Sequence, residues 1–448
     1  MKTVIYSTNT NEFEKKDFTI EQLPRCTEYL NKCTQKYTSS EIILALKQPG
    51  TFLLDLNLEK DSKYPENLKI YFLKGKSAEE IAEEIIGLKP DLAVQATPWI
   101  EPLDWLPLQD CLIAEILSEK GIKTSGHSVK TAMTCFDKRR SRDFLLANGF
   151  NAAKSVYIHH ELFRIERGRP EIINNPYQEL VFSRIKKMRF PLIIKDTFGL
   201  SSFGMDVVKT FPMAKNILTS KKNSGDRLAE EFLDGPQFGT EIHGTPGNYT
   251  IFPPFMFSTN QYGITSPKQS VKIGPVLNEK YNLKEFYRTM NLLAEKLELN
   301  GIAQVDLVFH EKKWYIIEIN PRLSGLTPAI SSSAGKSIPE LLLDAASGRN
   351  EKNPEMKYVA DIKFPVVSSE MQKKLYEADG VLFVRQMLNK KARQRREEGF
   401  CEVVLGGRNS IQELKADLEN LNKNFQEIIE PSFYKKALEM LKEINSGA

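Results

Sequence analysis

The sequence places two acidic residues in adjoining segments that favour β-structure. Apolar and β-branched runs at Ala303–Phe309 and Trp314–Ile319 are joined by a short polar turn at His310–Lys313, which is the pattern of a β-hairpin. Residues directly opposite each other on paired strands have neighbouring side chains. Asp306 is therefore predicted to lie close to Glu318.

Three oxygen-bearing side chains are expected on one surface of this hairpin. Because strand side chains alternate between the two faces, Glu318 and Asn320 should share one face while Ile317 and Ile319 share the other. Carboxylates packed this closely repel each other and raise one pKa unless a hard cation lies between them, and oxygen ligands suit a Mg²⁺ that bridges phosphates. The alternative is an edge hairpin with incidental solvated acids, which would suffice for Asp306 alone. The whole string DLVFHEKKWYIIEINPR favours the metal site.

A lysine and a glycine-rich loop form the second chemical signal, in the string FPLIIKDTFGLSSFGM. Lys195 ends an apolar strand, which would hold its charge at the edge of a sheet with its stem packed. The loop Gly199–Gly204, which contains Ser201 and Ser202, can offer N–H groups and hydroxyls to phosphate oxygens and can close as a lid. The alternative is a plain hairpin connection.

The third signal is LAEEFLDGPQFGTE, residues 228 to 241. A strand that ends in Glu230–Leu233, before a turn at Asp234–Pro236, can offer backbone groups to an adenine edge and a carboxylate to its amino group. Taken alone, this segment is also compatible with an ordinary acidic strand end.

The composition is that of a globular protein with about three folded units in 448 residues. The net charge of +4 is too small to indicate a nucleic-acid or membrane partner. Five scattered cysteines without a CxxC pair favour reduced thiols over disulfides or zinc. The N-terminus lacks the apolar core of a signal peptide, and no stretch is apolar enough to span a membrane. These features predict a cytoplasmic protein.

The first third of the chain predicts a parallel α/β layer, because short β-prone runs alternate with amphipathic helical patterns. No GxGxxG follows a predicted strand, so a dinucleotide-binding domain is not indicated. The predicted strands are Thr3–Tyr6, Thr51–Leu54, Leu68–Phe72 and Asp91–Gln95, and the predicted helices are Ala78–Ile86 and Leu108–Glu119.

Further along, Asp137 begins a helical run with an acidic cap and a glycine stop. Past Gly348, three strands, a basic run and two terminal helices are expected. The predicted domains are an N-terminal α/β unit (1–125), two central units (126–238 and 239–349) and a C-terminal unit (350–448). The overall class is α/β with α+β parts.

The order of these motifs resembles the ATP-grasp superfamily. An early Asp-Lys pair, a lysine with a Gly/Ser loop, EEFLDG, and an aspartate followed by EINPR occur in the expected order between about residues 90 and 345. The branch that the chain most resembles contains D-alanine–D-alanine ligases and L-amino acid ligases. The resemblance implies an N-terminal parallel α/β domain, central subdomains that clamp a nucleotide, and a C-terminal α+β extension.

The resemblance also implies roles for individual residues. Lys138 and Lys195 would contact ATP phosphates, and Arg322 would face an acyl phosphate. Asp306, Glu318 and Asn320 would hold two Mg²⁺ ions, for which Mn²⁺ can substitute. The loop residues Ser201, Ser202, Gly204 and Met205 would cover the phosphates, with Ser201 also orienting the substrate, and Glu230, Phe232 and Leu233 would bind adenine.

The sequence departs from the family pattern at three positions. Gln237 stands where a ribose-binding acid is usual, and Glu241 matches an acid common among L-amino acid ligases. The resemblance implies that both are among the nucleotide-binding residues. Gln304 stands where D-alanine ligases have an arginine at the reaction centre, a charge that Arg322 would supply instead. The polar loop Asn260–Gly274, with Lys268 and Lys272, is a second candidate lid.

These features predict an ADP-forming ligase that joins a small-molecule carboxylate, an amino acid or peptide, to an amine through an acyl phosphate. A homodimer is expected by analogy. Two alternatives stay open: an ATP-grasp carboxylase or phosphate-transfer enzyme that uses bicarbonate, and a binding protein that keeps the fold without catalysis. The basic run from Lys390 to Arg396 is offset by Glu397 and Glu398, so it does not favour a nucleic-acid partner.

Overall fold

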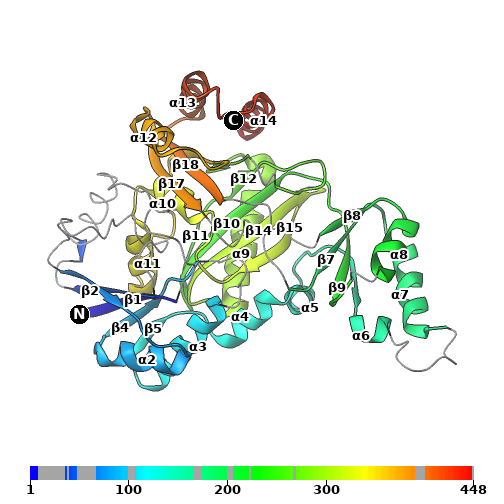
Figure 1. Ribbon diagram of the computed structural model, residues 1–448, viewed down its shortest axis with the longest axis horizontal. Coiled ribbons are helices and arrows are strands. Elements are labelled where there is room, and N and C mark those ends of the chain that lie inside the picture. The colour runs from blue at the N-terminus through cyan, green and yellow to red at the C-terminus, as the bar shows by residue number, and fades with distance from the viewer. Residues whose placement is uncertain are drawn as a thin grey trace.

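A computed structural model of the chain describes residues 1–8, 36–37, 40–47, 67–98, 106–164, 174–198, 205–220, 223–265, 269–388 and 399–445. Within these ranges the strands form three sheets (Figure 1). The predicted class, α/β with α+β parts, is confirmed.

The N-terminal sheet is parallel, with strand order β3-β2-β1-β4-β5. Buried apolar runs form its inner strands, and α2 begins with a capping box between Ser77 and Glu80. The predicted parallel layer is confirmed, whereas β2 and β5 were not anticipated, and Thr51–Leu54 lies outside the described residues. The elements are β1 (Lys2–Ser7), β2 (Glu41–Leu46), β3 (Leu68–Phe72), α2 (Ala78–Gly87), β4 (Leu92–Gln95), α3 (Leu106–Glu119) and β5 (Lys123–Ser125).

Two helices lead from this layer to a four-stranded sheet with the order β6-β9-β7-β8. The first helix ends at Asp137, whose side chain caps the second by accepting from the N–H groups of Arg139 and Arg140. In Figure 1 the small sheet and its helices project to the right of the central sheet. The elements are α4 (Val129–Phe136), α5 (Lys138–Ala147), β6 (Ser155–Ile158), α6 (His160–Phe163), α7 (Pro176–Lys186), β7 (Leu192–Asp196), β8 (Asp206–Val208), α8 (Phe211–Thr219) and β9 (Arg227–Glu231).

The central sheet has nine strands, ordered β15-β14-β10-β12-β13-β16-β18-β17, with β11 paired to β10. One face packs on α9, α13 and α14 through the largest apolar core, and α10 packs on the other face. The strands are β10 (Gln237–Thr245), β11 (Asn248–Ile251), β12 (Phe255–Phe257), β13 (Ser270–Gly274), β14 (Gly301–His310), β15 (Lys313–Asn320), β16 (Tyr358–Phe364), β17 (Val381–Leu388) and β18 (Gly399–Arg408). The helices are η2 (Glu279–Tyr281), α9 (Leu283–Leu297), α10 (Thr327–Ala334), α11 (Ile338–Ser347), α12 (Ser369–Glu377), α13 (Ile411–Asn424) and α14 (Pro431–Asn445).

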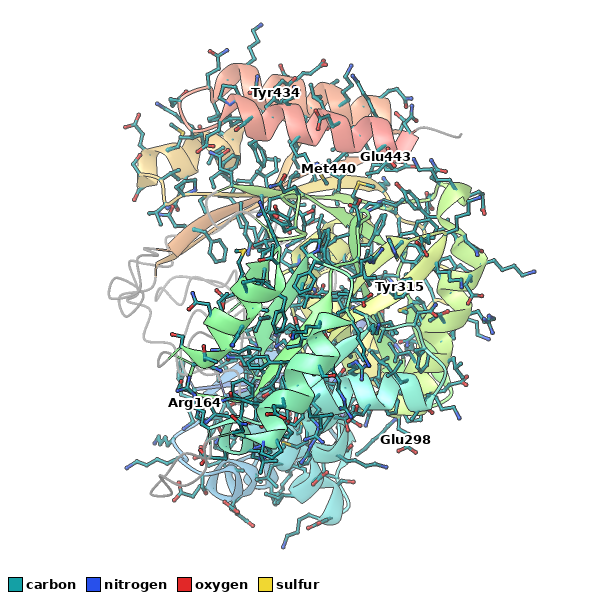
Figure 2. All side chains as sticks on the ribbon, turned by 90° about the vertical axis from the view of Figure 1, so that its right-hand side faces the viewer. Arg164, Glu298, Tyr315, Tyr434, Met440 and Glu443 are labelled. Carbon is teal, nitrogen blue, oxygen red and sulfur yellow. The ribbon has the colours of Figure 1, made fainter. Side chains whose placement is uncertain are left out.

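The C-terminal strands extend the central sheet, because β16 pairs with β13. The three strands and two terminal helices were anticipated, but α12 was not, and the basic run falls between β17 and β18 rather than after them. Figure 2 shows α14, with Tyr434, Met440 and Glu443 labelled, beside α13. Glu443 accepts hydrogen bonds from Lys280 and Tyr281, which ties α14 to η2.

None of the helices within the described ranges is long and apolar enough to cross a membrane. The predicted domain boundaries stay a prediction.

A buried histidine joins the N-terminal layer to the central sheet. The Nε2 of His127 is 2.8 Å from the carbonyl oxygen of Ile302, and the N–H of Asn300 donates to its Nδ1. The imidazole is therefore neutral, with its proton on Nε2. Burial lowers the pKa of His127 to about 4.

This environment predicts that His127 makes folding stability depend on pH. The unfolded chain binds an extra proton between about pH 6.5 and pH 4, so stability is lost as the pH falls through that window, by up to about 3 kcal/mol. Urea unfolding of the wild type and a His127→Gln variant at pH 7.5 and pH 4.5 measures this. The wild type should lose more stability than the variant, and equal losses would contradict the role given to His127.

Candidate active site

The pairing of β14 with β15 brings the two predicted acids opposite each other. Asp306 is the direct partner of Glu318, and Gln304 is the partner of Asn320. A β-bulge follows at once, because Leu307 pairs with Ile316 and leaves Ile317 as an extra residue. All four polar side chains consequently lie on one face of the sheet.

The bulge corrects one detail of the predicted hairpin. Ile319 packs into the main core, as does Ile316, but Ile317 lies on the opposite face, against the cluster of Val308 and Leu233. Ile317 and Ile319 therefore do not share a face. With uninterrupted alternation, Glu318 would follow Ile316 into the core, and the extra residue turns it toward the site instead.

The paired acids have opposite pKa shifts. The pKa of Asp306 is raised to about 7, first by desolvation and next by the charge of Glu318. Gln304 donates a 2.5 Å hydrogen bond to Asp306, which acts to lower this pKa. Desolvation also acts to raise the pKa of Glu318, but the charge and hydrogen bond of Lys138 outweigh it and lower the pKa overall. The pair thus retains an unneutralised repulsion that a cation would relieve.

Two lysines from different elements meet beside this hairpin. The Nζ of Lys138, on the first turn of α5, is 3.0 Å from an oxygen of Glu318, and the Nζ of Lys195 is 2.6 Å from an oxygen of Glu230. The backbone N–H of Lys138 donates to the carbonyl of Thr197, two residues beyond Lys195. This bond holds the start of α5 against the end of β7.

The lysines line a hollow of about 310 Å³, open volume included, between the two sheets. Its walls come from α5, from β7 and β9 of the small sheet, and from β15 of the central sheet. Ile316, Ile317 and Ala153 supply apolar surface next to the charged groups Lys138, Lys195 and Glu230. An apolar wall beside ammonium groups suits an aromatic ring attached to an anionic tail.

The predicted adenine-binding segment lies at one end of this hollow. Glu230 lines it, and Leu233 packs with Val308 in the cluster that also receives Ile317. Phe232 makes an edge-to-face contact with Tyr262, at 6.2 Å between ring centres.

The first part of the predicted second lid contacts Phe232 and Gln237. Gln237 lies tightly against Gly263, where any added side-chain carbon would overlap its amide nitrogen. The Asn260 side chain stabilises the turn by accepting from the N–H of Tyr262. The phosphate-loop residues Ser201, Ser202 and Gly204, and Lys268 of the second lid, lie outside the described residues.

Glu241 does not fit the nucleotide-binding role predicted for it. It is fully buried, and its Oε1 accepts from the hydroxyls of Ser324 (2.8 Å) and Thr327 (2.6 Å). Its Oε2 is 2.7 Å from the Nε2 of His243. Its Oε1 is therefore committed to the loop that follows Arg322, and its Oε2 to His243 on the same strand.

Arg322 lies at the start of that loop, next to the acids. Its guanidinium donates to the Oδ1 of Asn320 at 2.9 Å, and its charge lowers the pKa of both Asp306 and Glu318. Leu323, the following residue, forms a parallel bridge with Pro98 just after β4. The end of an N-terminal strand thereby reaches the predicted reaction centre.

The N-terminal sheet reverses its strand order between β1 and β4, which is where ligands bind in open α/β sheets. Asp110 ties these two strand ends together, because its carboxylate accepts from the hydroxyls of Thr8 and Thr97. Burial raises the pKa of Asp110 to about 7. The hydroxyls of Thr8 and Thr97 thus fix the edge of the N-terminal layer that faces Arg322.

The structure adds two residues near the site whose contacts were not predicted from the sequence. Gln304 was noted only for replacing an arginine, and it is a hydrogen-bond donor to Asp306. Gln304 and Asp306 are two residues apart on one strand, and this spacing could have indicated that their side chains share a face. Asp361 is bonded to Lys272 and comes from β16, beyond the part of the chain that carries the motifs.

Comparisons with known proteins agree with this arrangement. A family model described as an ATP-grasp domain matches residues 166–326. Residues 166–326 thus match an ATP-grasp domain.

The curated relatives of the chain include large chains of carbamoyl phosphate synthase. The carbamoyl phosphate synthase large chain of Clostridium perfringens is 23% identical over 351 residues, covering 75% of this chain and 30% of that protein. The chain thus spans less than a third of the length of this curated relative.

Two solved structures share the fold over nearly the whole chain. The L-amino acid ligase from Bacillus licheniformis has a TM-score of 0.61 at 16% identity, covering 96% of this chain and 98% of that one. The second is the biotin carboxylase domain of Hydrogenobacter thermophilus 2-oxoglutarate carboxylase, solved with MgADP, ADP and bicarbonate. It has a TM-score of 0.60 at 14% identity, covering 100% of this chain and 99% of that one.

The contacts of Glu241 predict a positioning role that can be separated from nucleotide binding. Glu241→Ala should lower kcat about tenfold or more, because the Arg322 loop loses its anchor, while the KM for ATP changes less than about threefold. Glu241→Gln should retain most activity, since its amide oxygen still accepts from Ser324 and Thr327.

Steady-state kinetics at varied ATP, with circular dichroism as a check of folding, measure this difference. A large rise in the KM for ATP with kcat unchanged would instead support the ribose-binding role.

Proposed function

We propose that the chain is an ADP-forming ligase that joins a carboxylate to an amine through an acyl phosphate. The observation that carries this proposal is the meeting of Asp306, Glu318 and Asn320 with Lys138 and Lys195, at a hollow between two sheets. Acids able to hold a divalent cation, and ammonium groups facing them, are the parts needed to bind and polarise a nucleotide tail.

The residues fit a magnesium ion bound together with phosphate. Asp306 and Glu318 face each other, the charge of Glu318 helps to raise the pKa of Asp306, and Asn320 adds a third oxygen. Within the described ranges no group of three or more His, Cys, Asp or Glu side chains could hold a metal alone, which suits a cation that takes its remaining ligands from phosphate and water. Asp306, Glu318 and Asn320 would hold the Mg²⁺, which would supply positive charge to neutralise the phosphates. Mn²⁺ is the expected substitute.

The proposed reaction has two balanced steps. A carboxylate oxygen of the first substrate bonds to the γ-phosphorus of ATP as the bond to the β,γ-bridging oxygen breaks, which releases ADP. The amine nitrogen then bonds to the acyl carbon, phosphate leaves with the bonding electrons, and the nitrogen loses a proton. The amide and free phosphate are the products.

The chain's own residues have separate tasks in this scheme. Lys138 and Lys195 stabilise the charge of the phosphate chain, and Arg322 faces the acyl phosphate. The Glu230–Leu233 segment would receive adenine, with Phe232 and Gln237 held under the turn around Tyr262. Ser201, Ser202 and Gly204 would cover the phosphates and exclude water from the intermediate.

The proposed carboxylate substrate is an amino acid or peptide, which approaches between Arg322 and the ends of β1 and β4. The bridge between Pro98 and Leu323 supports this placement, because it brings the N-terminal strand ends to the Arg322 loop. A homodimer remains part of the proposal by analogy only.

A bicarbonate-using ATP-grasp enzyme is the second candidate. It is favoured by the carbamoyl phosphate synthase relatives and by the similar carboxylase domain solved with bicarbonate. One assay distinguishes the ligase from the bicarbonate-using enzyme. Free amino acids and small carboxylic acids are tested in pairs, with ATP and Mg²⁺, for the release of ADP and phosphate. The ligase requires an amine as well as a carboxylate, whereas release that depends on bicarbonate alone would favour the second candidate.

Removal of either acid should abolish ADP formation without unfolding the protein. Asp306→Asn and Glu318→Gln each remove one negative charge from the proposed metal face, and we expect a loss of 100-fold or more in kcat. The rate of ADP release with the most active substrate pair is the measurement.

Glu311→Gln is the matched control, because Glu311 is exposed at the turn of the same hairpin. It should retain wild-type turnover. Wild-type turnover in both the Asp306 and Glu318 variants would remove the proposed metal site.

A further inference from the structure

A lysine on β13 shares the face of the central sheet that carries the paired acids. Asp306 is opposite Gly239, and a side-chain carbon on Gly239 would overlap the ring of Phe257. Phe257 is in turn opposite Lys272, which is opposite Asp361. Directly opposed residues point to the same side of a sheet. Lys272 and Asp361 therefore lie on the face that carries Asp306.

Lys272 joins two parts of the chain that are far apart in the sequence. Its Nζ is 2.7 Å from the Oδ2 of Asp361 on β16, and it also donates to the carbonyl oxygen of Gly325 in the Arg322 loop, residues 322–326. The sequence pattern predicted Lys272 within a lid, whereas it lies inside β13, which pairs with both β12 and β16. The backbone of this lysine is consequently fixed by the sheet.

Asp361 holds the ammonium group of Lys272 in place. Asp361 is 1% exposed, and its Oδ1 has no hydrogen-bond partner in the part of the chain that the structure describes. Burial raises the pKa of Asp361, and the charge of Lys272 is the largest cause that opposes this rise. Because a buried carboxylate costs free energy unless an opposite charge lies beside it, the two side chains stabilise each other in one arrangement.

The peptide group between Gly325 and Leu326 is held at both ends. Its carbonyl oxygen accepts from Lys272, and its N–H donates to the Oγ of Ser324 at 2.9 Å. The hydroxyl of Ser324 in turn donates to Glu241. Lys272 on β13 and Glu241 on β10 thus fix the same short turn from two different strands.

The turn is the route by which Lys272 acts on the site. β13 lies three strands from β14, roughly 14 Å at the usual strand spacing. Gly325 is only three residues after Arg322, whose guanidinium donates to Asn320 among the proposed metal ligands. Misplacement of a reacting or binding group by about 1 Å can lower a rate about a hundredfold. A shift of the turn would therefore affect the reaction although Lys272 touches no reacting atom.

We propose that Lys272 is a positioning residue for the ligase reaction and that Asp361 holds it against the Arg322 loop. The inference rests on the proposed function and adds the C-terminal strands to the parts of the chain on which the reaction depends. β16 lies beyond the segment that carries the motifs and supplies Asp361. It acts through one ammonium group, which bonds to both Asp361 and Gly325.

Hydrogen exchange of the nucleotide-free protein, followed by mass spectrometry, tests this positioning without any substrate. The double variant Lys272→Met/Asp361→Asn removes both charges together, so that no unpaired charge stays buried. The peptide that covers Arg322–Ile330 should exchange about tenfold faster than in the wild type, as expected for the loss of a hydrogen bond to a charged group. A peptide from α9 should exchange at the wild-type rate.

Steady-state kinetics with the most active substrate pair test the consequence for the reaction. The double variant should have a kcat lower by about tenfold or more, with the KM for ATP changed less than about threefold, because the Arg322 loop is displaced and the nucleotide contacts are not. Lys272→Arg keeps the charge and the donors. It should retain most of kcat and the slow exchange of the loop.

Asp417→Asn is the matched control. Asp417 also pairs with a C-terminal strand, since its Oδ2 is 2.7 Å from the Nε of Arg408 on β18. It lies on α13, on the opposite face of the central sheet from α10. This variant loses an ion pair of the same region and should keep the wild-type exchange of Arg322–Ile330 and the wild-type kcat. Circular dichroism of each variant verifies that it is folded.

The inference is wrong if the double variant leaves the exchange of Arg322–Ile330 unchanged, if α9 exchanges faster to the same extent, or if Asp417→Asn has the same effects. Faster exchange with an unchanged kcat also contradicts it, because the contact would then be structural only. Faster exchange confined to the loop, with a lower kcat that Lys272→Arg does not share, would support it. If the wild type releases ADP with no substrate pair, the ligase proposal fails, and the exchange data still decide whether Lys272 holds the loop.

Discussion

The repulsion between Asp306 and Glu318 is the constraint on which the rest of the site depends. Sheet pairing holds the two carboxylates opposite each other, and desolvation together with this repulsion raises the pKa of Asp306 to about 7. Lys138 compensates Glu318 and Gln304 donates to Asp306, yet neither places a positive charge between the two acids. The divalent cation that we propose, shared with phosphate, would resolve the repulsion and would explain why such a costly pair is built into a sheet.

Three sheets contribute to the proposed reaction centre around that pair. The small sheet supplies Lys195, and the helix leading to it supplies Lys138. The N-terminal layer contacts the residue after Arg322 through Pro98. Glu241 stabilises the Arg322 loop from beneath, and on the far side of that loop Lys272 bonds to Gly325. The loop is thus held from both sides while Arg322 remains next to the acids, which is the preorganisation that electrostatic catalysis requires.

Much of this arrangement could be predicted from local patterns. The alternation of apolar runs predicted the parallel layer and the hairpin, and the acidic cap at Asp137 predicted the start of the helix that carries Lys138. The bulge at Ile317 could not be predicted, because an inserted residue has no signature in an apolar run and reverses the parity of every residue after it. The environment of Glu241 was also hidden, since it depends on hydroxyl groups more than eighty residues away. The pairing of β16 with β13 is long-range in the same way and carries Asp361 to the site.

The most direct test of the central claim is a crystal structure with Mn²⁺ and a non-hydrolysable ATP analogue, with the ion located by its anomalous scattering. The account predicts an ion bonded to Asp306, Glu318 and Asn320 and to the terminal phosphates, with both lysines on the phosphate chain. Phosphates bound elsewhere, or an ion that contacts neither carboxylate, would contradict it.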